Sequence, residues 1–325
     1  MGNINSFSSR HFRLEQLADG VYAAINAEDG WAISNAGIID LGDRTLIYDS
    51  FMSPEAARDL RDTAEKLTGR PVHAVINSHP HNDHIWGNQV FSANVDIIST
   101  TRTRELIINE GPVEIQGFRD VAQTRLEALE AQFAEARDET TRNHLRVSII
   151  YFQAIIATLP VLQIRFPNLT FTGELTFSGP KRTAKLITFE GGHSGSDAIL
   201  HLPDDGIMFM SDLLFSGGHP YLADGDPDQV KLILAQVREL QARTFVPGHG
   251  PVGQTRHLDW MDEYINTLNT LVSISIENGA TEAETDKIAI PKEYQHLIFP
   301  TFFQSNIKFL YNRQMNSRAG LAKKG

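Results

Sequence analysis

His79-Pro80-His81-Asn82-Asp83-His84 places three imidazoles and one carboxylate within six residues. The stretch follows the apolar run Ala74-Val75-Ile76, which has the composition of a buried strand. Metal-binding and catalytic groups are often carried by loops that a rigid sheet holds at the end of a strand. Imidazole and carboxylate are good ligands for zinc and similar divalent ions. The stretch therefore predicts a metal loop whose alternate residues reach two adjacent metal ions, the alternative being a polar turn that is histidine-rich by chance.

Ligand-type residues recur downstream, each at the end of an apolar run typical of a strand. They are His193 after residues 184–189, Asp212 after 207–211, and His249 after 244–246. Glycines flank both histidines, which suits a loop that must turn sharply beside an ion. Taken singly, His193 and His249 have an ordinary interpretation as loop residues, and Asp212 has one as the cap of a helix beginning at Leu213. Their recurrence at strand ends, in this order, favours a metal site.

Together these motifs resemble those of the metallo-β-lactamase superfamily, over residues 20–253. The resemblance implies an α+β fold, a four-layer αββα sandwich with a dinuclear metal site at one edge. It implies that the first metal is held by His79, His81 and His193. It implies that the second is held by Asp83, His84 and His249, and that Asp212 bridges the two. The implied cofactors are two divalent ions, expected to be Zn²⁺, with Mn²⁺ and iron as alternatives.

Asp49 matches an earlier acidic position of the family. The resemblance implies that it orients a ligand histidine rather than binding metal itself. A turn residue at the end of the strand 45–49 is an equally good interpretation from the sequence.

We expect one domain over residues 1–325. Strands are predicted at 21–24, 32–39, 45–49, 74–78, 96–99, 169–171, 175–177, 182–189, 198–202, 207–210 and 244–246. Pro54 to Leu67 is predicted to be a helix that ends at Gly69, and residues 228–240 a second helix.

Residues 101–162 have helical periodicity and no strand signal. Leu126, Leu129, Phe133 and Ala136 fall on one face of the expected helix. We predict a helical insertion beside the active site, which serves either as a lid or as the contact of a homodimer. Residues 256–325 are predicted to form a C-terminal helical extension.

Composition limits the classes of function. The net charge is 29 − 40 = −11, which argues against nonspecific nucleic-acid binding. The chain has no cysteine, so disulfides, thiolate ligands and cysteine nucleophiles are excluded. The stretch Met1–Phe7 is polar and lacks the apolar core of a signal peptide, and no segment has the length needed to span a bilayer. A cytoplasmic protein with no membrane partner is expected.

The resemblance implies a metal-dependent hydrolase, in which a hydroxide bridging the metals cleaves an ester, lactone, thioester or amide-type bond of a small molecule. Asp83 is expected to orient the hydroxide and to handle its proton. Ser194 and Ser196 do not lie in a Gly-x-Ser-x-Gly elbow, so a serine hydrolase is disfavoured.

The bridging Asp212 and the missing cysteine resemble the glyoxalase-II-like and lactonase-like branch more than the β-lactamases proper. The chain departs from glyoxalase II because its C-terminal helices lack a basic cluster for glutathione, and from typical lactonases at Gly195-Ser196-Asp197. His219 and Tyr221 follow Asp212 closely and are predicted to line the pocket and donate hydrogen bonds to a carbonyl, with loop packing as the alternative. Phe51 and Trp86 are interpreted as core residues rather than pocket walls. A β-lactamase, a mononuclear iron oxygenase of the same fold and a binding protein with a degenerate site remain alternatives.

Overall fold

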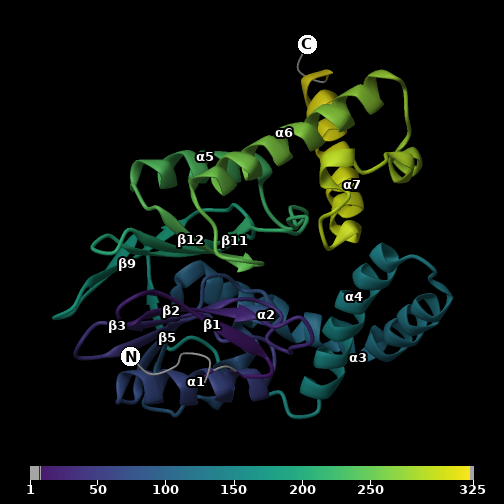
Figure 1. Cartoon of the computed structure of the whole chain (residues 1–325). Coiled ribbons are helices and arrows are strands. Elements are labelled where there is room, and N and C mark those ends of the chain that lie inside the picture. Colours follow the sequence, from purple (N-terminus) through teal and green to yellow (C-terminus); the bar gives the residue numbers. More distant parts are fainter. Residues whose placement is uncertain (1–6, 8, 323–325) are drawn as a thin grey trace.

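Two β-sheets pack face to face, with helices on both outer surfaces (Figure 1). The computed structural model describes residue 7 and residues 9–322. We predicted the absence of a signal peptide from the stretch Met1–Phe7, and most of that stretch lies outside the described residues. The helices α5 and α6 cover one sheet and α1 covers the other, which makes four layers (Figure 1). The predicted αββα sandwich is therefore confirmed.

The first sheet has seven strands in sequence order. They are β1 (Phe12–Ala18), β2 (Val21–Asn26), β3 (Ala36–Asp40), β4 (Thr45–Tyr48), β5 (Val72–Ile76), β6 (Asp96–Thr100) and β7 (Leu169–Phe171). Pairing is antiparallel from β1 to β4 and parallel from β4 to β7. The crossover from β4 to β5 is α1 (Pro54–Thr68), where the Ser53 side chain accepts the Ala56 N–H and Gly69 ends the helix at φ +69°.

The second sheet has five strands in the order β12-β11-β10-β9-β8. They are β8 (Glu174–Ser178), β9 (Thr183–Phe189), β10 (Asp197–Leu202), β11 (Ile207–Phe215) and β12 (Thr244–His249). Only β12 pairs in parallel, because α5 (Pro227–Glu239) carries the chain back from β11. Leu46 and Ile76 of the first sheet and Leu200 and Phe209 of the second belong to the apolar core between them.

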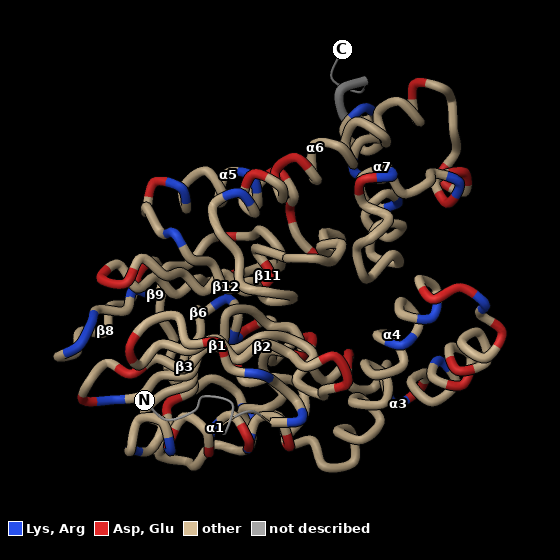
Figure 2. The backbone as a smooth tube through the Cα atoms, in the orientation of Figure 1, with Lys and Arg blue, Asp and Glu red and all other residues tan. Residues whose placement is uncertain are grey.

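The remaining helices extend the sandwich at one side (Figure 1). Between β6 and β7, α3 (Thr101–Glu135) and α4 (Glu139–Thr158) form a hairpin that carries acidic and basic residues along its length (Figure 2). After β12 come α6 (Thr255–Glu277), η3 (Glu282–Lys287), η4 (Lys292–Tyr294) and α7 (Pro300–Ala322). Both regions are helical as expected, whereas their status as additions to a smaller core stays a prediction. None of the helices in the described residues has the apolar length that a bilayer requires.

Two local predictions were wrong. The strand expected from residue 32 begins at Ala36, because Ile33 adopts φ +69° and its N–H is held by Asn26 Oδ1 at 3.0 Å. The alternation expected along the metal loop ends at His81, since the helices α2 (Asn82–Ile85) and η2 (Trp86–Val90) follow directly. Residues 213–215 continue β11, which excludes the alternative interpretation of Asp212 as a helix cap.

Candidate metal centre

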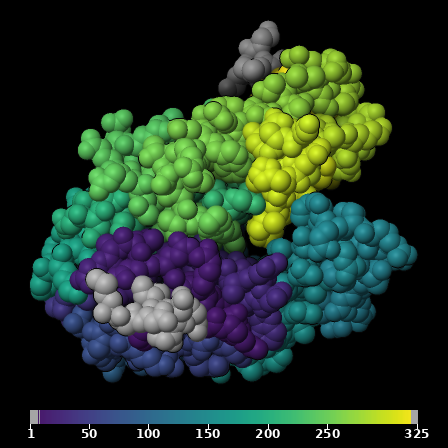
Figure 3. Space-filling view, viewed as in Figure 1, coloured from purple at the N-terminus to yellow at the C-terminus, as the bar shows by residue number. Residues whose placement is uncertain are grey.

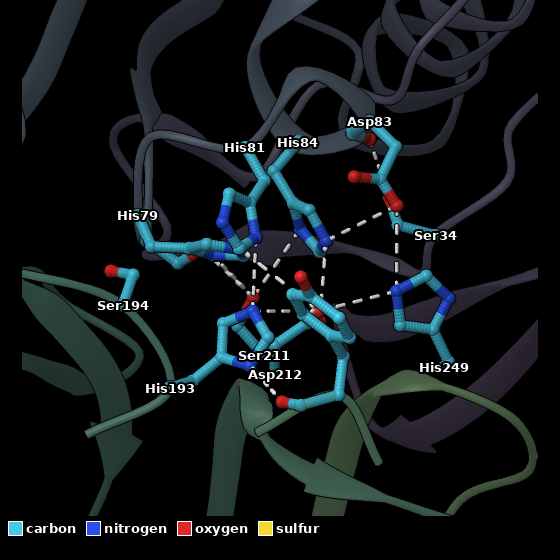
Figure 4. Close-up of polar contacts among 12 residues, drawn as sticks. Ser34, His79, His81, Asp83, His84, His193, Ser194, Ser211, Asp212 and His249 are labelled. Carbon is cyan, nitrogen blue, oxygen red and sulfur yellow. Dashed lines mark hydrogen bonds and ion pairs between the residues drawn. The ribbon is translucent and has the colours of Figure 1, made fainter. Parts of the chain in front are cut away.

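The seven ligand candidates come together at one edge of the sandwich (Figure 4). His79 and His81 follow β5, and Asp83 and His84 lie in α2. The other three come from the second sheet: His193 from the β9–β10 loop, Asp212 from within β11, and His249 from the end of β12. Segments up to 170 residues apart (249 − 79) thus meet because both sheets end at this edge.

His79, His81, His193 and Asp212 form the first cluster. His81 Nδ1 lies 3.0 Å from His79 Nε2 and 2.9 Å from His193 Nε2. Asp212 Oδ2 lies 3.3 Å from His193 Nε2 and 4.0 Å from His79 Nε2. These nitrogen atoms and one carboxylate oxygen therefore face a common point.

Asp83, His84 and His249 form the second cluster. Asp83 Oδ2 lies 3.4 Å from His249 Nε2 and 3.6 Å from His84 Nε2. Asp212 reaches this cluster as well, with Oδ1 at 3.2 Å from His84 Nε2 and Oδ2 at 3.3 Å from His249 Nε2. Its carboxylate thus lies between the two clusters, as Figure 4 shows.

Contacts on the outer side of the imidazoles fix which nitrogen points inward. His84 Nδ1 donates to Asp49 Oδ2 at 2.9 Å, and His193 Nδ1 donates to the Tyr221 carbonyl at 3.0 Å. His81 Nε2 lies 2.8 Å from Asp224 Oδ2. A carboxylate or carbonyl can only accept, so each of these rings, when neutral, turns a lone pair toward the cluster.

Asp49 performs the orienting contact that was predicted for it. It is fully buried, and its carboxylate also accepts the Ser78 N–H at 2.8 Å and the Ser211 hydroxyl at 3.0 Å. Asp49 and Ser211 both have positive φ, +60° and +47°. Such strain persists where the surrounding structure imposes it, and it is concentrated at functional sites.

The electrostatic field of the centre favours a cation. Burial lowers the pKa of His193 to about 4, and burial with the imidazoles of His84 and His81 holds the pKa of His79 well below its usual range. Burial also opposes protonation of His84, yet the carboxylates around it, led by Asp83, raise its pKa well above the usual value. The first cluster therefore keeps free lone pairs, and the second attracts positive charge.

Two buried atoms test whether this residue set fits metal ions. Within residues 9–322, neither His84 Nε2 nor Asp212 Oδ1 has a hydrogen-bond partner, although the two atoms are only 3.2 Å apart. Leaving such atoms unsatisfied in a protein interior is costly. Metal ions would satisfy both, and the donor set of five imidazoles and two carboxylates is one that zinc accepts.

Removing the charge of Asp49 is expected to weaken metal binding. In Asp49→Asn the side chain keeps its shape but accepts fewer hydrogen bonds, so His84 loses its fixed orientation. We expect metal affinity to fall about 10- to 100-fold, the usual effect of losing such a partner. A chelator titration measures it, with Asp43→Asn in an exposed turn as the control. Equal affinity in Asp49→Asn and wild type would contradict the role assigned to Asp49.

The side chains of His219 and Tyr221 contact the C-terminal helices. His219 is buried, with Nδ1 at 2.8 Å from the Tyr264 hydroxyl, and Tyr221 packs on Phe302 with ring centroids 5.1 Å apart. Their catalytic roles stay predictions, although the Tyr221 main chain does hold His193. Phe51 and Trp86 are buried in apolar clusters, as interpreted.

Sequence reasoning missed several residues that surround the centre. Asp224 lies 143 residues from the His81 that it contacts, and Glu114 and Tyr151 reach Asn82 from the α3–α4 hairpin. In the sequence, none of these three residues is distinguished from other polar residues near it. Only the loop 224–226, in which two acidic residues flank Gly225, has a pattern that could have indicated a contact with the metal centre.

Comparison with known proteins gives a consistent result. A family model described as metallo-beta-lactamase superfamily matches residues 29–249. A metallo-beta-lactamase from Pontibacter korlensis is similar with a TM-score of 0.56 and 15% identity, covering 78% of this chain and 99% of that one. FIM-1 from Pseudomonas aeruginosa, in its mono-zinc form, has a TM-score of 0.55 and 14% identity, covering 79% and 95%. A metallo beta lactamase from Erythrobacter litoralis has a TM-score of 0.56 and 17% identity, covering 80% and 98%. At these identities the structural likeness establishes the fold alone.

Proposed function

The chain belongs to the metallo-β-lactamase superfamily, and on that premise we propose that it is a hydrolase that works with two divalent metal ions, most simply Zn²⁺. The observation that carries the proposal is the position of Asp212. Its carboxylate lies between the two clusters, within 3.3 Å of imidazole nitrogens from both. A set of ligands built for one ion would not need this shared carboxylate.

The residues that would hold the ions fall into two groups. His79, His81 and His193 would hold the first, Asp83, His84 and His249 would hold the second, and Asp212 would serve both. Ions held there would lower the pKa of a bound water and polarise a substrate carbonyl.

Asp83 has the position of a group that handles the proton. Its side chain is 12% exposed, whereas the shared Asp212 is 6% exposed, so Asp83 lies nearer to the solvent side. Ser34 Oγ donates to the Asp83 main-chain carbonyl at 2.6 Å and fixes this turn of α2. Asp83 would therefore be placed to orient a water and accept its proton.

The proposed substrate is a small molecule with an ester, lactone, thioester or amide-type bond. The aspartate shared by the two clusters and the absence of cysteine support the glyoxalase-II-like or lactonase-like branch over β-lactamases proper.

A substrate screen tests the proposal. Zinc- or manganese-loaded enzyme is assayed with esters, lactones, thioesters, β-lactams and phosphodiesters. We expect turnover in the carboxylic ester, lactone or thioester class, and loss of it on chelation. Turnover of β-lactams alone would support the alternative function, a β-lactamase. The absence of metal-dependent hydrolysis in every substrate class would contradict the proposal.

A further inference from the structure

Three of the ligand candidates at the metal centre are partly exposed. The side chains of His81, Asp83 and His249 are 23%, 12% and 12% exposed. Those of His79 and His84 are buried almost completely. A substrate must therefore approach across His81, Asp83 and His249, and the residues that border these three will contact it first.

The α3–α4 hairpin forms one border of this opening. Asn82, between two of the open ligands, donates to Glu114 Oε1 at 2.8 Å and to the Tyr151 hydroxyl at 3.3 Å. Behind them, Tyr151 contacts the rings of Phe118 and Phe152, at 6.2 and 5.4 Å between centroids. This border thus has a polar edge at the centre and an aromatic surface beyond it.

The start of α7 forms the opposite border. The ring of Phe299 meets that of His249 edge-on at 6.0 Å, and Phe302 stacks on Phe299 at 5.1 Å. Phe302 also packs on Tyr221, whose carbonyl holds His193. Phe299 and Phe302 are only partly buried, although Phe299 adopts φ +62°, a strained conformation for a phenylalanine.

The two borders approach each other at their outer end. His144 of α4 contacts the main chain of Leu297, just before α7. Figure 3 shows the molecule hollowed where the yellow C-terminal helix, the teal hairpin and the N-terminal sheet meet. A molecule bound at the centre would therefore lie between aromatic side chains contributed by both helical regions.

Acidic side chains also lie at this opening. Asp224 is in contact with His81, and Glu114 lies near enough to His81 and Asp83 for their charges to act on it. Burial raises the pKa of Glu114 to about 7, and metal ions held at the centre would add positive charge, so the charge of the opening does not indicate the charge of the substrate. The aromatic borders are therefore the feature of the opening that bears on specificity.

We propose that the substrate carries a large apolar group, aromatic or long aliphatic, which packs between Tyr151 and the Phe299–Phe302 pair. The inference rests on the proposed function, since it places this group next to the bond that is cleaved. Burial of apolar surface on these rings supplies the binding free energy. Phe302 and Tyr151 then determine specificity.

Binding of inert ketones tests the apolar site independently of turnover. Calorimetry on the zinc-loaded enzyme compares 4-phenylbutan-2-one with butan-2-one. We expect the phenyl ketone to bind at least about tenfold more tightly, and Phe302→Ala or Tyr151→Leu to remove most of this preference. Phe177→Ala, a partly buried phenylalanine on the distant strand β8, is the matched control and should keep the preference. Equal binding of both ketones to the wild type would overturn the proposal.

Hydrolysis of matched esters tests the same apolar site during turnover. The measured quantity is the ratio of kcat/KM for phenyl octanoate to that for phenyl acetate. Phe302→Ala should lower this ratio about tenfold, whereas the control Phe177→Ala should not. Hydrolysis with no preference for octanoate over acetate and no change in Phe302→Ala would refute the inference and leave the proposed function intact. Phenyl-ketone preference without hydrolysis of any ester, lactone or thioester would refute the proposed function and leave the inference standing.

Discussion

Asp212→Ala is expected to abolish turnover and to lower the metal content of the protein. The substitution removes a carboxylate that lies between the two clusters, with oxygens within 3.3 Å of His84, His193 and His249. The imidazoles that remain would then face each other with little compensating negative charge. Loss of several kcal/mol of charge stabilisation corresponds to a fall in kcat of about 10³-fold or more.

Two measurements on Asp212→Ala separate this effect from unfolding. Circular dichroism should show a folded protein, and metal analysis should show less than the wild-type content. Asp228→Ala, which removes an exposed carboxylate of α5, should retain both activity and metal. If the folded Asp212→Ala variant kept the wild-type kcat, the proposed role of Asp212 in turnover would be ruled out.

Gly248→Ala is expected to have the second largest effect. A Cβ at this position would lie 1.7 Å from Asp212 Oδ1 and 2.8 Å from the Asp212 nitrogen. Neither atom can give way, because the carboxylate is enclosed by imidazoles and the nitrogen is main chain within β11. We expect a displacement of Asp212, with kcat/KM lowered about 100-fold, as a misplacement of about 1 Å typically produces. Overpacking should also reduce the free energy of unfolding by about 1–3 kcal/mol.

Gly117→Ala is the matched control for Gly248→Ala. A Cβ at Gly117 would meet no atom within 4 Å, and the residue lies in the helix α3. This substitution should leave kcat/KM unchanged and stabilise the helix by up to about 1 kcal/mol. Steady-state kinetics and thermal unfolding of the two variants give the comparison. Equal kcat/KM in both would show that the approach of Gly248 to Asp212 has no catalytic consequence.

The sequence indicated the ligand candidates because they follow four separate apolar runs, one of which precedes the whole metal loop. His79, His193 and His249 could be placed at strand ends without knowing which strands are neighbours. The resemblance to a family then brought them to one edge, and the structure places them there. The contact of Asp49 with His84 was accessible in the same way, because Asp49 directly follows β4, which is paired with the strand before the metal loop.

Other features depend on contacts that no local pattern records. The positive φ of Ile33 follows from a hydrogen bond to Asn26. The first residues of β1 alternate between buried and exposed, but its polar residues kept the strand from being recognised in the sequence. Helical periodicity predicted α3 and α4, but the approach of Glu114 and Tyr151 to Asn82 depends on how the hairpin packs. Tertiary packing of this kind can be seen only in the folded chain.

The number and kind of metal ions per chain test the central claim most directly. Protein that hydrolyses its substrate is analysed by mass spectrometry for metals, before and after treatment with a chelator. We expect close to two divalent ions per chain, zinc or manganese, with metal and activity lost and restored together, because Asp212 serves both clusters. One iron per chain, with oxygen consumed during turnover, would contradict the account and identify an oxygenase instead.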